Sequence, residues 1–310
     1  MPDAVTICEC FARDGLQHEP EFVPTATKVA LLDSFAAAGF RRIEATSYSH
    51  LDRVPGFSDA SQVLAAITRR PDVAFKATCP NPRAVQRALD DLEAGHGAEE
   101  LSLLVSASES HTERNLRTTR AGQWERVAEM TRLADRRFRL VGVVSVAFGC
   151  PFEGAIDPGR VAEDVARFVD LGAGLVTLGD TTGVATPQSV RALFTRLERA
   201  HPGFPMVAHF HNTRGTGIAN AVAALDAGCR NFDTAFGGVG GHPTSIRYGA
   251  GLTGNVCTED LVSLFDAMGV ETGLDLDQLA TASAACEAAL GRPLHSRVAR
   301  AGFARSAALA

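Results

Sequence analysis

The sequence predicts an α/β fold, a (β/α)8 TIM barrel with additional C-terminal helices. Short apolar segments typical of buried strands alternate with segments of helical periodicity over about 270 residues. Eight parallel strands joined by right-handed crossovers close into a barrel. The chain has 310 residues, 45% of them hydrophobic, which suffices for one barrel. No linker or low-complexity tract divides it, so we expect residues 1–310 to form a single domain.

Each predicted strand is followed by a helix or by a loop that leads to one. The strands are expected at 4–10, 42–46, 73–78, 101–105, 140–146, 175–178, 205–211 and 230–235. The helices between them are expected at 25–38, 58–69, 82–93, 122–136, 158–171, 187–200 and 218–225. Two more helices are expected after the barrel, at 258–268 and 275–290.

Local signals support several ends of these elements. Thr25 is a candidate N-cap for its helix, and Gly39 stands just past the expected end. Pro187 occupies the favoured first position of another helix. The segment between the fourth strand and residue 122 is polar and predicts a loop. A glycine-rich stretch at about 236–257 follows the last strand and predicts a mobile lid over the barrel mouth.

Composition and charge exclude several classes of partner. The formal net charge is −6 and no basic cluster is interleaved with aromatics, so neither nucleic acid nor an anionic membrane surface is expected to bind. No segment offers about 18 uninterrupted apolar residues, and the N-terminus lacks a secretory signal pattern. The seven cysteines are odd in number and scattered, as in a reducing compartment. We therefore expect a cytoplasmic protein.

His209 and His211 are the first candidate metal ligands. Residues two apart in a strand face the same side, so both imidazoles should project together at the end of the seventh strand. A lone His-x-His is most often an ordinary strand pair. Barrel active sites, however, collect at the C-terminal ends of the strands, which favours a functional role. The adjacent Gly215–Asn220 stretch lacks the third glycine of a dinucleotide-binding motif.

Polar residues at other strand ends should converge on these histidines. Arg13 and Asp14 follow the first strand, Glu44 ends the second, and Asp180 follows the sixth. In a closed barrel the first, second, seventh and eighth strands are near neighbours. Oxygen and nitrogen ligands without thiolate favour Mg²⁺ or Mn²⁺, and no C-x-x-C indicates structural zinc. Asn255 precedes the helix expected at 258 and would either cap it or give an amide oxygen to the metal.

Six motifs of one known family occur in this chain. They appear in the same order as in the family and span nearly the whole sequence. They are Arg13-Asp14-Gly15-Leu16-Gln17, Ile43-Glu44-Ala45-Thr46-Ser47, Gly149-Cys150-Pro151-Phe152-Glu153-Gly154, Gly179-Asp180-Thr181-Thr182-Gly183, His209-Phe210-His211-Asn212-Thr213 and Gly254-Asn255-Val256-Cys257-Thr258-Glu259-Asp260-Leu261. By these motifs the chain resembles 3-hydroxy-3-methylglutaryl-CoA (HMG-CoA) lyase, a metal-dependent barrel of the DRE-TIM metallolyase superfamily.

The resemblance implies a divalent-metal-dependent carbon–carbon lyase. It would cleave HMG-CoA or a related 3-hydroxyacyl-CoA, such as citramalyl-CoA, to acetyl-CoA and a 2-oxo acid. Arg13 would stabilise the developing enolate, and Glu44 and Asp180 would position the substrate or assist proton transfer. The implied metal ligands are Asp14, His209, His211 and Asn255. The residues expected to bind the substrate are Gln17, Thr46, Ser47, Arg247 and Glu259. The partners implied are the acyl-CoA and a second copy of the chain in a homodimer.

The glycine-rich loop departs from the family pattern. That loop normally reads Gly-Gly-Cys-Pro, with the cysteine protonating the acetyl-CoA enolate, whereas this chain has Gly240-Gly241-His242-Pro243 in a slightly longer loop. Imidazole can donate a proton near neutral pH, so His242 is a candidate replacement acid. The substrate could also have changed, because Arg247 and Tyr248 would suit an extra carboxylate.

Two other functions stay open on the sequence. A Claisen-type synthase of the isopropylmalate or homocitrate kind shares the barrel and His-x-His, although such enzymes usually carry a long regulatory region after the barrel. A non-catalytic barrel kept as a binding protein would explain the missing cysteine. Cleavage of 3-hydroxyacyl-CoA thioesters with release of acetyl-CoA separates the lyase from both.

Overall fold

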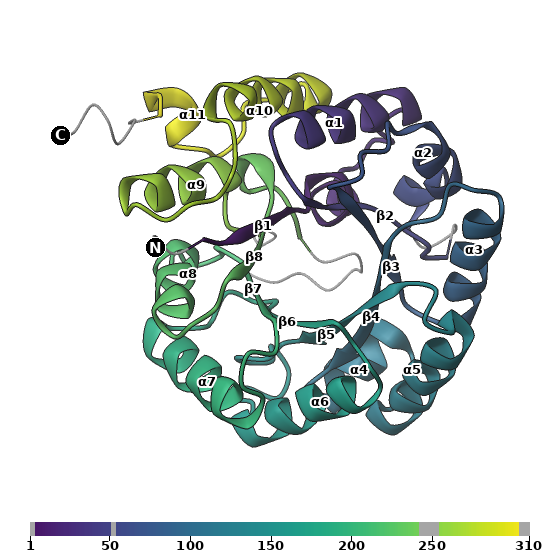
Figure 1. Ribbon diagram of the computed structural model, residues 1–310. Coiled ribbons are helices and arrows are strands. Elements are labelled where there is room, and N and C mark those ends of the chain that lie inside the picture. The colour runs from purple at the N-terminus through teal and green to yellow at the C-terminus, as the bar shows by residue number, and fades with distance from the viewer. Residues whose placement is uncertain (1–3, 51–53, 242–253, 304–310) are drawn as a thin grey trace.

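The computed structural model, which describes residues 4–50, 54–241 and 254–303, confirms the closed barrel (Figure 1). Its eight strands are parallel and pair in chain order, and β1 completes the ring by pairing with β8. The strands are β1 (Thr6–Glu9), β2 (Arg42–Ser47), β3 (Ala74–Cys79), β4 (Glu100–Ser106), β5 (Arg139–Ser145), β6 (Leu175–Asp180), β7 (Met206–Phe210) and β8 (Asn231–Thr234).

Helices form an outer ring around the strands, as Figure 1 shows. They are α1 (Thr25–Ala37), α2 (Ala60–Ala66), α3 (Pro82–Glu93), α4 (Glu109–Leu116), α5 (Arg120–Ala134), α6 (Pro158–Asp170), α7 (Pro187–Ala200) and α8 (Gly217–Asp226). The chain continues into α9 (Thr258–Ala267), α10 (Leu276–Leu290) and the short α11 (Val298–Ala301). The additional C-terminal helices are thus confirmed, and α10 packs beside α1.

Two predictions about local structure were wrong. The segment after β4 is not only a loop, because α4 begins there with the Ser108 side chain accepting the His111 backbone N–H at 3.1 Å. Its hydrophilic sequence carries no apolar stripe, which hid it from periodicity. Thr25 is not an N-cap: it is the first residue of α1, and its hydroxyl donates to Asp59 at 2.7 Å.

The barrel interior changes character along its axis. Val141, Leu175 and Val207, near the starts of their strands, form a small buried apolar cluster. Beside this layer, Arg42 of β2 and Glu100 of β4 form a buried ion pair with an N–O distance of 2.8 Å. Polar and charged side chains occupy the inward positions closer to the C-terminal ends. The interior is therefore closely packed near the starts of the strands and polar near their C-terminal ends.

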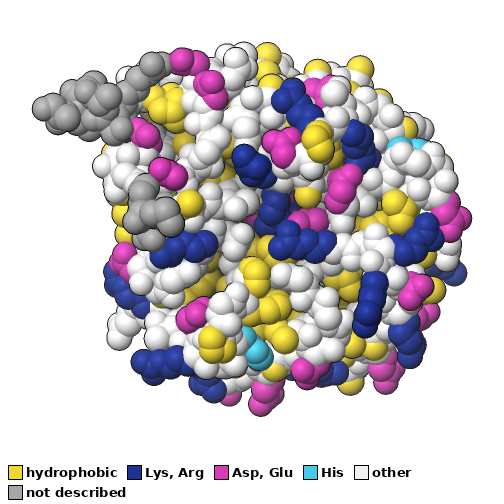
Figure 2. Space-filling view, in the orientation of Figure 1, with side chains coloured by type: hydrophobic (Ala, Val, Ile, Leu, Met, Phe, Trp, Pro, Cys, Tyr) yellow, Lys and Arg dark blue, Asp and Glu magenta, His cyan; other side chains and the backbone are white. Residues whose placement is uncertain are grey.

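The outer surface carries charges of both signs. On the face in view in Figure 2, basic and acidic side chains are interspersed and do not gather into a patch of one sign. Among the described residues, no helix is long and apolar enough to cross a membrane. Of the glycine-rich segment expected at about 236–257, only the two ends belong to the described residues. They include the 3-10 turn η4 (Phe236–Gly238).

Candidate active site

A cavity opens at the C-terminal ends of the strands. Its lining includes Arg13, Asp14, Glu44, His209 and His211, and about 700 Å³ of space between its walls, open solvent included, is free of protein atoms. The convergence predicted from the strand ends is thus observed for these five side chains.

Asp14, His209 and His211 form a compact triad. Asp14 belongs to η1 (Phe11–Gly15), a π-helical turn directly after β1, while the two histidines share the inward face of the end of β7. The two Nε2 atoms lie 3.2 Å apart, and Asp14 Oδ2 is 4.0 Å from His209 Nε2 and 3.9 Å from His211 Nε2. A point equidistant from these atoms lies about 2.2 Å from each, close to ordinary metal–ligand distances. The triad fits a divalent cation.

Asn255 lies beside the triad. Its Nδ2 donates to Asp14 Oδ2 at 2.7 Å and to Val239 O at 3.0 Å, whereas its buried Oδ1 has no hydrogen-bond partner among the described residues. A buried amide oxygen of this kind suits a cation as ligand. The capping alternative was wrong, because α9 begins at Thr258 with Cys257 at the N-cap. Gly240 has φ +142°, and a Cβ there would come within 2.3 Å of Asn255 Nδ2, so glycine is required.

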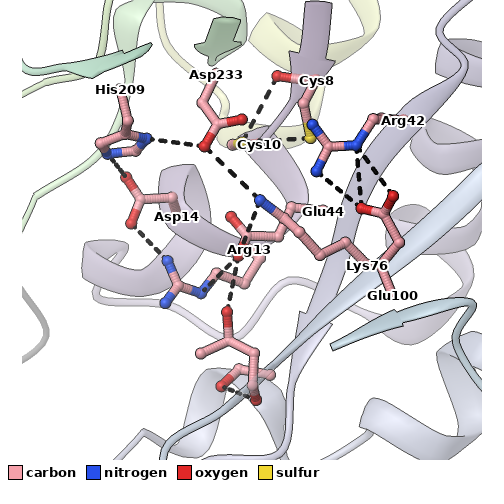
Figure 3. Close-up of polar contacts among 12 residues, drawn as sticks. Cys8, Cys10, Arg13, Asp14, Arg42, Glu44, Lys76, Glu100, His209 and Asp233 are labelled. Carbon is pink, nitrogen blue, oxygen red and sulfur yellow. Dashed lines mark hydrogen bonds and ion pairs between the residues drawn. The ribbon is translucent and has the colours of Figure 1, made fainter. Parts of the chain in front are cut away.

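A ring of charged side chains includes two members of the triad, Asp14 and His209 (Figure 3). Asp233 Oδ2 lies 3.3 Å from His209 Nδ1 and 3.7 Å from Lys76 Nζ. Lys76 Nζ is 3.8 Å from Glu44 Oε1, which lies 3.5 Å from Arg13 Nε. Arg13 returns to Asp14 at 2.8 Å. We call this set the charged ring: Arg13, Asp14, Glu44, Lys76, His209 and Asp233. When an imidazole binds a metal through one nitrogen, a carboxylate hydrogen-bonded to the other nitrogen fixes the orientation and tautomer of the imidazole. Asp233 occupies this position at Nδ1 of His209.

The charged ring fixes the ionisation of its members. Burial alone would raise the pKa of Asp14, but Arg13 and the two histidines outweigh it and lower that pKa to about 2. Burial opposes the charged form of Asp233 too, yet Lys76 and the His209 hydrogen bond hold its pKa well below the usual range. The pKa of Lys76 is raised well above its usual value, because Asp233 outweighs burial.

The resulting charge balance favours a bound cation. An imidazole that ligates a metal is neutral. With His209 in that form, the three carboxylates of the charged ring outnumber its two cationic side chains, so the cluster carries one net negative charge. A divalent cation would reverse this to one net positive charge. The buried site therefore suits a dication and then an anionic ligand.

Sequence reasoning missed Lys76 and Asp233. Lys76 lies in the predicted strand 73–78 and Asp233 in 230–235, and both line the cavity while almost fully buried. Lysine and aspartate are rarely buried unless they are paired. A charged residue inside a short apolar strand was therefore the available signal.

Several predicted site residues take other positions. Both oxygens of Asp180 accept backbone N–H groups, from Val184 at 2.9 Å and Ala185 at 3.0 Å, and burial raises its pKa to about 6. Asp180 is not among the residues lining the cavity. Its hydrogen bonds support a structural role, in which it stabilises the turn after β6. Of the expected substrate-binding residues, Gln17 lines the cavity, whereas Thr46 and Ser47 are buried in β2 outside that lining. His242 and Arg247 lie outside the described residues.

Glu259 also lies away from the cavity. It is fully buried on α9, where its carboxylate accepts the Gly237 backbone N–H at 2.9 Å and the Ser283 hydroxyl. These bonds join α9 and α10 to the turn that follows β8. The contacts support a structural role in place of the expected substrate contact.

His111 of α4 lines the opposite part of the cavity and is fully buried. Its Nδ1 lies 2.9 Å from Ser106 Oγ. Burial lowers the pKa of His111 from 6.5 to about 4. Folding therefore favours the neutral imidazole.

We expect His111 to make folding stability depend on pH. Its folded pKa lies below the unfolded value, so the stability it contributes is complete above about pH 6.5 and is lost as pH falls towards 4. The loss should be on the order of 2–3 kcal/mol. Urea unfolding of the parent and of His111→Asn between pH 4 and 7.5 measures it, because the asparagine variant should lose less stability over that window. Parallel curves for the two proteins would contradict the prediction.

The chain matches the HMGL-like family model over residues 4–285. It is 40% identical to (R)-citramalyl-CoA lyase of Chloroflexus aurantiacus, covering 97% of this chain and 95% of that protein. It is 36% identical to the mitochondrial hydroxymethylglutaryl-CoA lyase of Rattus norvegicus, and the match covers 97% of this chain and 90% of that protein. The solved structure of an HMG-CoA lyase from Acinetobacter baumannii, in complex with coenzyme A and 3-methylmalate, superposes with a TM-score of 0.90. Its sequence is 38% identical, and the match covers 97% of this chain and 95% of that chain.

Proposed function

The chain belongs to the HMGL-like family and is an acyl-CoA lyase, and we propose that it cleaves the C2–C3 bond of a 3-hydroxyacyl-CoA that bears a free carboxylate. The main observation in support of this proposal is that Asp14, His209 and His211 line one cavity together with Arg13, which is ion-paired with Asp14. Citramalyl-CoA and HMG-CoA are the two candidate substrates, each named in a relative's activity. The expected 2-oxo acid is the product only for citramalyl-CoA, because HMG-CoA carries its carboxylate one carbon further away and gives a 3-oxo acid.

The proposed site residues divide the reaction between them. A divalent cation, Mg²⁺ or Mn²⁺, held by Asp14, His209, His211 and Asn255 would supply Lewis acidity that lowers the cost of deprotonating the C3 hydroxyl. Of the two carboxylates expected to assist proton transfer, Glu44 lines the cavity and Asp180 does not. We therefore assign Glu44 as the base that accepts the proton of the C3 hydroxyl. The Thr78 hydroxyl donates to Glu44 Oε1 at 2.8 Å and holds it in place.

The carbon–carbon bond then breaks. Its electron pair moves onto C2 and the thioester carbonyl as an enolate, and the oxo acid leaves. The Arg13 guanidinium lines the cavity and would meet the charge that develops on the enolate oxygen. We assign protonation at C2 to His242, because it follows Gly241, which lines the cavity, and because it replaces the cysteine of the family pattern.

A panel of CoA thioesters tests the proposal. Purified protein with Mg²⁺ or Mn²⁺ should release acetyl-CoA from citramalyl-CoA or HMG-CoA, and chelation should stop the release. A Claisen-type synthase would instead consume acetyl-CoA and an oxo acid and release free CoA. A non-catalytic barrel would do neither. Absence of acetyl-CoA release from every thioester in the panel would refute the lyase assignment for these substrates.

A homodimer and a cytoplasmic location remain expectations from the sequence. Sedimentation velocity of the purified protein checks the first of them.

A further inference from the structure

Lys76 is a buried cation with unused hydrogen-bond donors. It is 2% exposed and lines the cavity from β3. The carboxylate oxygens of its two ion pairs, on Asp233 and Glu44, lie 3.7 and 3.8 Å from Nζ, beyond hydrogen-bond distance. In the part of the chain that the structure describes, Nζ makes no hydrogen bond. An ammonium has three N–H donors and buries them at a cost unless they meet acceptors.

Lys28 shows what a satisfied buried lysine looks like in this protein. It is also 2% exposed, but its Nζ donates to Asp59 Oδ1 at 2.7 Å and to Gly56 O at 2.6 Å. Lys28 does not line the cavity. Burial alone therefore does not explain the open donors of Lys76.

Two hydroxyls of the same cavity are also unpaired. Ser102 of β4 and Thr177 of β6 line it, at 1% and 2% exposure. Neither Ser102 Oγ nor Thr177 Oγ1 has a hydrogen-bond partner among the described residues. Buried hydroxyls are normally bonded, so each unpaired one needs an explanation. An acceptor-rich ligand in the cavity would satisfy them together with Lys76.

We propose that Lys76, Ser102 and Thr177 form the subsite that binds the free carboxylate of the acyl group. The inference rests on the proposed function, which supplies a substrate with such a carboxylate. An ionised carboxylate only accepts hydrogen bonds and has about four lone-pair sites, which matches an ammonium and two hydroxyls. Its negative charge also meets the net positive charge of the charged ring with a divalent cation bound.

The competing role for Lys76 is to neutralise Glu44 and Asp233. That role predicts that losing Lys76 harms all ligands alike, whereas carboxylate binding predicts a loss confined to ligands that carry the carboxylate. A pair of thioesters of equal length separates the two. Glutaryl-CoA ends in a carboxylate, valeryl-CoA ends in a methyl group, and neither has the 3-hydroxyl needed for cleavage.

The experiment measures the dissociation constants of both thioesters by calorimetry with the Mg²⁺-loaded enzyme. The parent should prefer glutaryl-CoA, and Lys76→Met should reduce this preference about tenfold or more. Ser102→Ala and Thr177→Val should each reduce it roughly threefold to tenfold. Because these two changes remove only a hydroxyl from the cavity, they keep the test valid if Lys76→Met does not fold.

Lys28→Met is the matched control, since it removes a buried ammonium outside the cavity and should leave the preference unchanged. An undiminished preference in all three subsite variants would overturn the inference. So would an equal loss of affinity for both thioesters, which is the result expected of a structural lysine. The readout is binding, so the two proposals fail separately. A parent that cleaves no thioester yet prefers glutaryl-CoA through Lys76 refutes only the lyase assignment, and cleavage with a Lys76-independent preference refutes only the subsite.

Discussion

His211→Ala should lose the bound divalent cation and the lyase activity together. His211 Nε2 lies 3.2 Å from His209 Nε2 and 3.9 Å from Asp14 Oδ2, so its removal opens one side of the triad. Changing residues that merely orient metal ligands typically costs 10–100-fold in affinity or activity, and loss of a ligand should cost more. We expect kcat/KM to fall on the order of a thousandfold or more. Mn²⁺ titration followed by electron paramagnetic resonance measures the cation, and acetyl-CoA release measures the activity.

His201→Ala is the matched control for this variant. His201 stands at the C-terminal end of α7, where its backbone N–H bonds Leu197 O and its ring contacts Phe204. It does not line the cavity, so cation binding and turnover should both stay at parental levels. Full cation occupancy in a correctly folded His211→Ala protein would remove His211 from the ligand set.

The barrel and the triad could be predicted because both depend on local pattern. Strand periodicity places His209 and His211 on one face, and the end of β1 places Asp14 near them once the sheet closes. The register confirms this geometry, because β1 pairs with β8 and β7 pairs with β8 on its other side. The positions of these residues follow from chain order and strand period alone.

The partners inside the barrel could not be predicted in the same way. Lys76 of β3 reaches Asp233 of β8 across the interior, at 3.7 Å. That contact depends on strand tilt and side-chain length, which chain order does not give. The bonds of Asp180 and Glu259 depend on where turns present backbone N–H groups, at Val184 and Gly237 respectively. A polar residue in a family motif can therefore serve the scaffold, and only tertiary geometry reveals it.

The second large effect is expected for Arg13→Lys, which should lower kcat far more than it changes KM. Arg13 Nη1 donates to Asp14 Oδ1 at 2.8 Å, and its Nε lies 3.5 Å from Glu44 Oε1. Burial opposes its charge, but Glu44 and Asp14 outweigh burial and raise the pKa of Arg13. The guanidinium thus stays charged while its planar fork meets two carboxylates. Lysine keeps the charge, but its compact ammonium cannot hold both carboxylates and still face the substrate.

The proposed role of Arg13 gives the size and the form of this effect. The enolate charge develops only as the carbon–carbon bond breaks, so a misplaced cation should weaken the transition state more than the bound substrate. Loss of one such donor costs about 100-fold to 1,000-fold in kcat, and we expect a value in that range with KM within a few-fold. Steady-state kinetics on the best thioester of the panel, at saturating Mg²⁺, measure both constants.

Arg120→Lys is the control for losing a guanidinium fork. Arg120 Nη2 donates to both oxygens of Asp164 at 2.6 Å, and neither residue lines the cavity. This change should lower the melting temperature and leave kcat unaltered, because no substrate charge develops there. If Arg13→Lys instead raised KM and kept kcat, Arg13 would act in uniform substrate binding. If both constants were unchanged, the enolate charge would have to be met by another group of the cavity.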